Sequence, residues 1–281
     1  MRNIPFRAVL LALLAAPAAG GGFETRRGLV YARTCGDVLT LDAYVPEGPG
    51  PFPGVLVIHG GGWSARRPSD MTAISRALAR RGYVALNVTY RLAPEHRYPA
   101  AVDDVREALR WARREAPALK LDPARVGAWG YSAGAHLAAM LGVEDGEDIG
   151  PEDKVTAVVA GGTPAEFELW PHSPIVTPFI GKTFAEAPDL WREASPVSHA
   201  GPGDAPFFLY HGTKDVLVEP EQAKRMAAAL AKAGVRHEVF WQEGRGHVSA
   251  FVFDGGAVRG ALAFLDSVLR APLTAGASGL N

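Results

Sequence analysis

The sequence predicts an α/β fold in which a mostly parallel central sheet carries helices on both of its faces. Short apolar strands alternate with helical segments along most of the 281 residues, and this alternation is typical of parallel sheets. Hydrophobic residues make up 48% and charged residues 21% of the chain, which excludes disordered, collagen-like and coiled-coil proteins. We expect a single domain over residues 23–281, interrupted by a lid-like insertion at about residues 161–205.

The N-terminal segment, residues 1–22, has the layout of a secretory signal peptide. Arg2 and Arg7 come before an apolar run over residues 8–16, and the small residues of Ala16-Pro17-Ala18 follow. This order predicts export to the periplasm or the medium; an uncleaved anchor is the alternative. No later segment reaches the roughly 18 apolar residues of a membrane span, so we expect no stable membrane insertion after cleavage.

Charge and cysteine content narrow the possible partners. The chain has 29 Lys and Arg residues against 30 Asp and Glu residues, and this balance gives no sign of nucleic-acid binding. Cys35 is the single cysteine, so an intrachain disulfide is impossible. The Cys and His spacings of structural zinc sites are missing from the sequence, and we expect no metal and no cofactor.

The expected elements follow from hydrophobic periodicity and from helix-end signals. Alternating apolar residues over 38–45 predict a half-buried strand, and the continuous apolar run Val55-Leu56-Val57-Ile58 predicts a strand buried on both faces. Gly82 and Gly234 each follow a helical segment, as glycine often does at helix ends. The expected strands are 29–33, 38–45, 55–58, 83–90, 125–129, 155–160, 207–210 and 235–241, and the expected helices are 69–81, 99–116, 132–141, 219–233 and 256–269.

The insertion at residues 161–205 has seven prolines and no long periodic segment. Such a long irregular stretch in a compact domain is commonly a functional lid, and the alternative is a structural excursion that covers one end of the sheet. Its aromatic residues either line a pocket or form a small core of their own. These residues are Phe167, Trp170, Phe179 and Trp191.

The segment Gly130-Tyr131-Ser132-Ala133-Gly134 is a G-x-S-x-G motif between an expected strand and an expected helix. In this context the motif predicts a nucleophile elbow, a sharp turn that holds the serine hydroxyl clear of the sheet. The flanking glycines permit the close approach of strand and helix that such a turn needs. The alternative is an ordinary glycine-rich turn.

The segment His59-Gly60-Gly61-Gly62 follows the strand at residues 55–58. Successive glycines expose backbone N–H groups, and one such donor aimed at an oxyanion lowers a reaction barrier by about 3 kcal/mol. A phosphate-binding loop or a plain turn is the alternative. Phosphate binding is disfavoured, because Trp63 and Ser64 stand where a phosphate loop needs Lys and Ser or Thr.

An acid and a histidine follow two later strands. Asp215 comes after strand 207–210, and His247 comes after strand 235–241. The order Ser132, Asp215, His247 is that of serine hydrolases built on an α/β sheet. Ser132 is the expected nucleophile, His247 the general base and Asp215 the residue that orients the imidazole. Glu219 is a weaker candidate for the acid, because it lies at the start of a helix.

These motifs, with Tyr90-Arg91-Leu92-Ala93-Pro94-Glu95, resemble the α/β-hydrolases, specifically the hormone-sensitive-lipase-like esterases. The stretch from Ser132 to Ala138 also resembles the smaller feruloyl and acetyl-xylan esterases. The resemblance covers residues 39–269 and implies a carboxylesterase that needs no cofactor. It implies a small ester substrate, such as an acylated polysaccharide or an aryl ester.

The resemblance also implies roles for individual residues. The backbone N–H groups of Gly61, Gly62 and Ala133 are the implied oxyanion-hole donors, with Gly60 as an alternative. We expect Trp63 and Tyr131 to contact substrate. The family usually has aspartate at the position of Tyr131 and a longer N-terminal cap, and the shorter cap favours an open site for short acyl chains.

Two other classes of function stay open. An aryl-formamidase or a small peptidase would use the same triad, because esters and amides are cleaved with the same groups. A non-catalytic binding protein on this fold is also an alternative, since a fold does not dictate a function. The presence of all three triad candidates argues against the binding protein.

Overall fold

A central sheet of eight strands organises the chain, in the order β1-β2-β4-β3-β5-β6-β7-β8. The computed structural model describes residues 21–34, 36–143 and 149–270, so the expected signal peptide lies almost wholly outside the described residues. Strand β1 pairs antiparallel with β2, and β2 pairs antiparallel with β4. The remaining neighbours are parallel, which confirms the expected mostly parallel sheet. The strands are β1 (Phe23–Thr34), β2 (Asp37–Pro46), β3 (Phe52–Ile58), β4 (Val84–Val88), β5 (Leu121–Tyr131), β6 (Val158–Gly161), β7 (Phe207–Gly212) and β8 (His237–Gln242).

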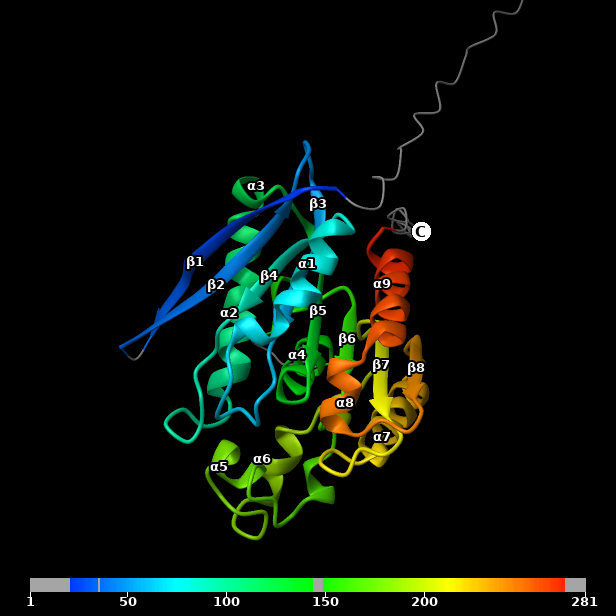
Figure 1. Cartoon of the computed structure of the whole chain (residues 1–281). Coiled ribbons are helices and arrows are strands. Elements are labelled where there is room, and N and C mark those ends of the chain that lie inside the picture. Colours follow the sequence, from blue (N-terminus) through cyan, green and yellow to red (C-terminus); the bar gives the residue numbers. More distant parts are fainter. Residues whose placement is uncertain (1–20, 35, 144–148, 271–281) are drawn as a thin grey trace, which may run out of the picture.

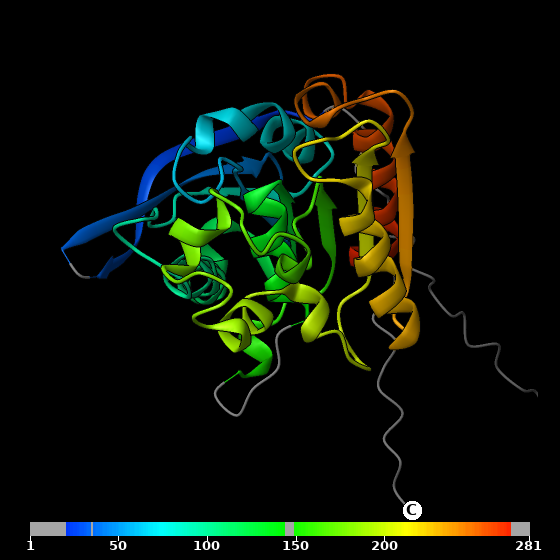
Figure 2. The same ribbon diagram turned by 90° about the horizontal axis from the view of Figure 1, so that it is seen from below.

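Helices cover both faces of this sheet (Figures 1 and 2). One face carries α1 (Thr72–Arg80) and α9 (Gly255–Leu269), whose buried side chains share one apolar cluster. The other face carries α2 (Ala100–Arg114), α4 (Ala133–Val143) and α7 (Pro220–Lys232), which share a second cluster. The remaining described helices are short: α3 (Ala116–Leu119), α5 (Val176–Ile180), α6 (Pro188–Glu193) and α8 (His247–Val252).

The apolar sequence of β3 explains its place inside the sheet. Its last four residues, Val55, Leu56, Val57 and Ile58, have no measurable exposure. Successive side chains of a strand point to opposite faces. Accordingly Leu56 and Ile58 join the cluster under α2, α4 and α7, whereas Val55 and Val57 join the cluster under α1 and α9. Strand β3 therefore contributes side chains to the apolar clusters on both faces of the sheet.

Several expected elements differ from the observed ones. The N-terminal hairpin is longer than expected and runs from Phe23 to Pro46. The expected helix 69–81 begins as a 3-10 turn at Pro68–Met71 before α1. Helix α8 was not expected, because its six residues are too few to show a helical period. In the structure His247 is the first residue of that helix.

The insertion between β6 and β7 lies at the carboxyl edge of the sheet, where α5 and α6 are placed (Figure 1). Phe167, Phe179 and Trp191 of the insertion are completely buried. They pack with the ring of Trp63, which stacks on Phe179 at a centroid distance of 4.4 Å. These three residues therefore form a core shared with Trp63, which lies outside the insertion, rather than the expected core of the insertion alone.

His136 of α4 joins this aromatic core. It is fully buried, and it accepts a hydrogen bond from the Trp63 indole N–H at 3.2 Å. Its Nε2 donates to the carbonyl of Ala194 in the insertion at 2.8 Å. The insertion thus covers part of α4, and α2 and the sheet cover the rest, so every residue of α4 is buried.

We predict that Gly134→Ala prevents stable folding. A Cβ at this position would lie 2.1 Å from the carbonyl oxygen of Ile58, a backbone atom that cannot rotate away. Overpacking typically costs about 1–3 kcal/mol, and a clash with backbone exceeds that range. Gly255→Ala is the matched control, because the nearest atom would lie 3.7 Å away. Urea unfolding of both variants is the measurement; equal stabilities would contradict the close approach of α4 and β3.

We also predict that His136 makes the protein less stable in mild acid. Burial lowers the pKa of His136 to about 4 from an ordinary value of 6.5. Between these values the unfolded chain binds the proton and the folded chain does not, so the free energy of unfolding falls as pH falls. The loss should be about 2 kcal/mol between pH 7 and pH 4.5.

Urea titrations at the two pH values, on the wild type and on His136→Gln, measure this effect. The variant should show a smaller decrease in stability than the wild type over the same interval. An identical decrease in both proteins would show that His136 contributes nothing to acid sensitivity.

Candidate active site

The turn between β5 and α4 holds Ser132 in a strained backbone conformation. Its φ is +56°, a left-handed value that costs a non-glycine residue about 1–3 kcal/mol. The turn is held from both sides, because the N–H of Ser132 donates to Gly161 at 2.8 Å and its carbonyl accepts from the N–H of His136 at 3.0 Å. A Cβ on Gly130 would lie 2.0 Å from the carbonyl oxygen of Gly134, so glycine is required there. This is the geometry that the G-x-S-x-G motif predicts.

Asp215 and His247 are in direct contact. The Nδ1 atom of His247 lies 2.7 Å from Oδ2 of Asp215. The other carboxylate oxygen of Asp215 accepts backbone N–H bonds from Leu217 at 3.0 Å and Val218 at 2.9 Å. Burial alone would raise the pKa of Asp215, but the hydrogen bonds from His247 and Val218 bring it below its ordinary value. Asp215 is therefore a carboxylate at neutral pH and favours a proton on Nδ1 of His247.

Two residues near the Asp215–His247 pair, His211 and Glu219, also form hydrogen bonds. His211 is buried, and its Nε2 donates to the carbonyl of Val218 at 2.7 Å, which holds the loop after Asp215. Burial lowers the pKa of His211, so this imidazole is neutral at neutral pH. Glu219, the weaker candidate for the acid, accepts a hydrogen bond from the Trp170 indole at 2.7 Å.

The glycine loop after β3 lies directly against the serine turn. A Cβ on Gly60 would lie 2.8 Å from the carbonyl oxygen of Tyr131 and 3.3 Å from Cβ of Ser132. Gly61 and Gly62 both have positive φ, at +114° and +59°. Ala133 is the first residue of α4, where backbone N–H groups have no partner within the helix. The three expected oxyanion donors are thus placed on the two segments that border Ser132.

Tyr90 braces the glycine loop, a role that no local sequence pattern assigns to this residue. Its ring stacks on His59 at 4.4 Å, and its hydroxyl donates to the carbonyl of His59 at 3.0 Å. The next residue, Arg91, forms an ion pair of 2.7 Å with Asp104. The Tyr-Arg-Leu-Ala-Pro-Glu string was the available signal, because it pointed to this segment without indicating which contacts it makes.

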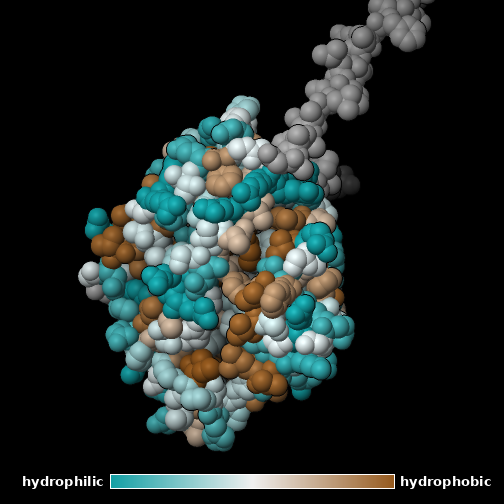
Figure 3. All heavy atoms as spheres, viewed as in Figure 1, coloured by the Kyte–Doolittle hydropathy of each residue, from teal (hydrophilic) through white to brown (hydrophobic). Residues whose placement is uncertain are grey.

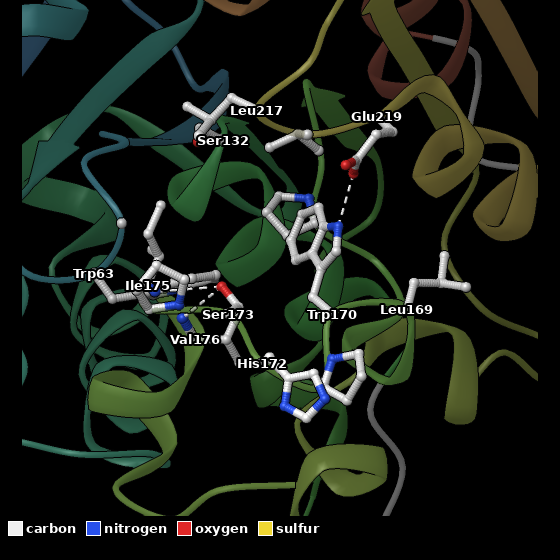
Figure 4. A pocket seen from close by; sticks show the side chains of 15 residues that line it. Trp63, Ser132, Leu169, Trp170, His172, Ser173, Ile175, Val176, Leu217 and Glu219 are labelled. Carbon is white, nitrogen blue, oxygen red and sulfur yellow. Dashed lines mark hydrogen bonds between the residues drawn. The ribbon is translucent and has the colours of Figure 1, made fainter.

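Two cavities meet at Ser132. The first, here called the insertion cavity, has a volume of about 460 Å³ and lies between the insertion and the loop 217–219. Figure 4 shows Trp170 in this cavity, with its indole N–H directed at Glu219 and with Ile175 and Trp63 across the space. Its lining is mainly apolar and includes three prolines of the insertion: Pro164, Pro171 and Pro174.

The second cavity, here called the histidine cavity, has a volume of about 320 Å³. Ser132 and His247 both line it, together with the glycine loop over residues 60–62. Ser64, Arg66 and Asp70 add polar groups on one side; Met71, Val248 and Phe251 add apolar ones. In the space-filling view apolar side chains gather around the hollows of this face (Figure 3).

The two residues expected to contact substrate are both largely buried. Trp63 borders the insertion cavity, but only 1% of its surface is exposed and its ring belongs to the aromatic core. Tyr131 borders the histidine cavity and is 6% exposed. Its hydroxyl is engaged by the backbone carbonyl of His247 at 2.6 Å. Of the four aromatic residues of the insertion named above, Trp170 is the one that lines a cavity next to Ser132.

Two further features considered from the sequence are a metal-binding group and a membrane-spanning helix, and the described residues contain neither. In residues 21–34, 36–143 and 149–270, no three His, Cys, Asp or Glu side chains gather as a metal-binding group. Within the same ranges every helix is too short or too polar to span a bilayer.

Comparison with solved structures identifies the fold. Apo esterase 2 of Thermogutta terrifontis matches with a TM-score of 0.75 and 26% identity, over 92% of this chain and 97% of that one. A truncated carbohydrate esterase from gut microbiota matches with a TM-score of 0.75 over 90% of this chain and 98% of that one, at 24% identity. The fold is that of the α/β-hydrolases, as expected.

Comparison with curated sequences identifies relatives over part of their length. Esterase LipC of Mycobacterium tuberculosis is 31% identical over 215 residues, which are 70% of this chain and 53% of LipC. Carboxylesterase NlhH of the same species is 42% identical over 91 residues, 32% of this chain and 28% of NlhH. The chain spans about half the length of the first of these relatives. The sequence profile of the BD-FAE family matches residues 41–230, and the chain belongs to that family.

Proposed function

We propose that this protein is a serine carboxylesterase that cleaves short-chain acyl esters through an acyl-enzyme intermediate. The observation that carries the proposal is that Ser132 and His247 line one cavity and that buried Asp215 is hydrogen-bonded to His247 behind it. The names of the relatives support it, because LipC and NlhH are called an esterase and a carboxylesterase. Esterase 2 of T. terrifontis is also described with bound butyrate and as phosphorylated by paraoxon.

The proposed mechanism assigns one task to each group. The Ser132 hydroxyl attacks the acyl carbonyl and passes its proton to Nε2 of His247. Asp215 keeps the Nδ1 proton in place and stabilises the imidazolium that forms. The N–H groups of Gly61, Gly62 and Ala133 stabilise the negative charge on the carbonyl oxygen. His247 then protonates the leaving alcohol, and an activated water releases the acid in the second half of the cycle.

The position of His247 distinguishes the two cavities. The leaving alcohol must lie next to this imidazole to receive its proton, and His247 lines the histidine cavity. We therefore assign the alcohol to the histidine cavity and the acyl group to the insertion cavity. The polar side of the histidine cavity suits a hydroxylated alcohol such as a sugar, and Phe251 suits an aryl alcohol. The apolar lining of the insertion cavity suits an acyl chain.

We further propose that the protein is exported. The support is the arrangement of residues 1–22, in which Arg2 and Arg7 come before an apolar run and a small-residue cleavage site. Fractionation of the producing cells, followed by N-terminal sequencing of the protein, tests this. A protein found in the cytoplasm with residues 1–22 intact would contradict the proposal.

We predict that Ser132→Ala abolishes ester hydrolysis. Loss of the nucleophile should lower kcat/KM by at least about 10⁴-fold, because binding and the oxyanion donors supply only the residual rate. The measurement is hydrolysis of p-nitrophenyl esters from acetate to palmitate by both proteins. The wild type should be fastest on the short esters. A maximum on the long chains would contradict the short-chain preference, and equal rates in both proteins would contradict the role of Ser132.

We predict that Trp170→Ala shifts the acyl-chain preference toward longer esters. Removal of this indole enlarges the insertion cavity, so kcat/KM for octanoate relative to butyrate should rise about 10-fold, the effect of one or two extra buried methylenes. Trp191→Phe is the matched control, because Trp191 is fully buried and lines neither of the two cavities. The same shift in both variants, or in neither, would contradict the acyl assignment.

A further inference from the structure

We propose that Tyr131 is a positioning residue that fixes the backbone of His247 relative to Ser132. The inference rests on the proposed triad and adds a function for the residue at which this chain departs from the aspartate usual in the esterases that it resembles. Tyr131 comes directly before Ser132 and ends β5, and its side chain reaches across to the first residue of α8. One short segment therefore places the nucleophile and holds the general base.

The contact is a hydrogen bond between side chain and backbone. The Tyr131 hydroxyl donates to the carbonyl oxygen of His247 at 2.6 Å. Burial raises the pKa of Tyr131 far above its ordinary value, so the phenol keeps its proton and remains a donor over the working pH range. Asp215 holds the ring edge of His247 at Nδ1, and Tyr131 holds its backbone. His247 is thus held at two points, its ring and its backbone.

The packing of the Tyr131 ring against α8 also restrains His247. The Tyr131 ring lies 5.2 Å from the His247 ring and 4.7 Å from the Phe251 ring, which is one helical turn further along α8. Gly162 leaves room for this arrangement, because a Cβ there would lie 3.0 Å from Cε1 of His247 and 3.2 Å from the Tyr131 hydroxyl oxygen. The ring therefore packs between Gly162 and the side chains of α8.

Helix α8 needs such a restraint. It has six residues, and a helix of this length is not stable in isolation. Gln242 binds the middle of this helix, donating to the carbonyl of Ala250 at 3.0 Å. Tyr131 binds the end that carries the imidazole. Because a displacement of about 1 Å can slow catalysis about 100-fold, loss of this bond should reduce turnover more than substrate binding.

The experiment compares Tyr131→Phe with Tyr210→Phe. Tyr210 is a matched control, because it is also a buried tyrosine, 1% exposed, and its ring lies 5.9 Å from that of Tyr131. Its hydroxyl accepts from the Trp129 indole at 3.3 Å and makes no contact with His247 among the described bonds. Both variants lose one buried hydroxyl, so both should lose a similar amount of thermal stability. They differ in whether the lost hydroxyl binds His247.

We expect Tyr131→Phe to lower kcat on p-nitrophenyl butyrate about 10-fold with KM unchanged, and Tyr210→Phe to change kcat less than twofold. We also expect the proton NMR signal of the His247 Nδ1 hydrogen to shift or broaden in Tyr131→Phe alone. A wild-type kcat in Tyr131→Phe would overturn the proposal. An effect confined to KM would also overturn it and would favour a substrate contact for Tyr131.

The NMR measurement separates this proposal from the proposed function. It needs no turnover, so it tests the hold of Tyr131 on His247 even if the wild type hydrolyses no ester. An inactive wild type with the shifted Nδ1 signal would refute the esterase proposal and support the positioning role. An active wild type with an unchanged signal in Tyr131→Phe would refute the positioning role alone.

Discussion

The close approach of α4 to the ends of β3 and β5 is the constraint on which the rest of the site depends. Gly130 and Gly134 permit it, because a side chain at either position would overlap backbone atoms. The approach forces the turn between them to be so tight that Ser132 adopts a left-handed conformation. The strain is supported by backbone hydrogen bonds to β6 and within α4. The packing of the core therefore fixes the position of Ser132, which does not depend on a flexible loop.

The insertion stabilises this arrangement from outside the sheet. It covers part of α4 and surrounds Trp63, whose backbone continues the glycine loop. His136 links the two, since it bonds both to Trp63 and to the insertion backbone. The same segment also supplies Trp170 and Ile175 to the insertion cavity. The buried aromatic residues of the insertion thus fix the glycine loop through Trp63. Its partly exposed side chains, Trp170 and Ile175, shape the insertion cavity.

Much of the fold and the site could be predicted from the sequence, because the signals are local. The apolar run at residues 55–58 indicates a buried strand, and Ser132 lies within a motif that is read from five neighbouring residues. Asp215 and His247 were candidates because each follows a strand. The roles of Trp63 and Tyr131 could not be predicted in this way. Tyr131 binds a residue 116 positions away, and no sequence pattern reports a contact over that separation.

The arrangement of the insertion also could not be predicted from local sequence patterns. Its four aromatic residues look alike in sequence, but packing buries Phe167, Phe179 and Trp191 and leaves Trp170 beside the cavity. Helix α8 is too short for a periodic pattern, so the sequence indicated the position of His247 in the chain and not its place at a helix start. Tertiary contacts decide which aromatic residues are buried and where α8 begins, and local sequence patterns do not report such contacts.

Covalent labelling of the full chain shows whether Ser132 is the nucleophile. Paraoxon transfers a diethylphosphoryl group to an activated serine hydroxyl, and peptide mapping by mass spectrometry locates that group. We expect one label per chain, on Ser132, and no label after Ser132→Ala. A label on another residue, or ester hydrolysis that continues at the untreated rate after Ser132 is fully labelled, would contradict the assignment of Ser132, His247 and Asp215 as one catalytic unit.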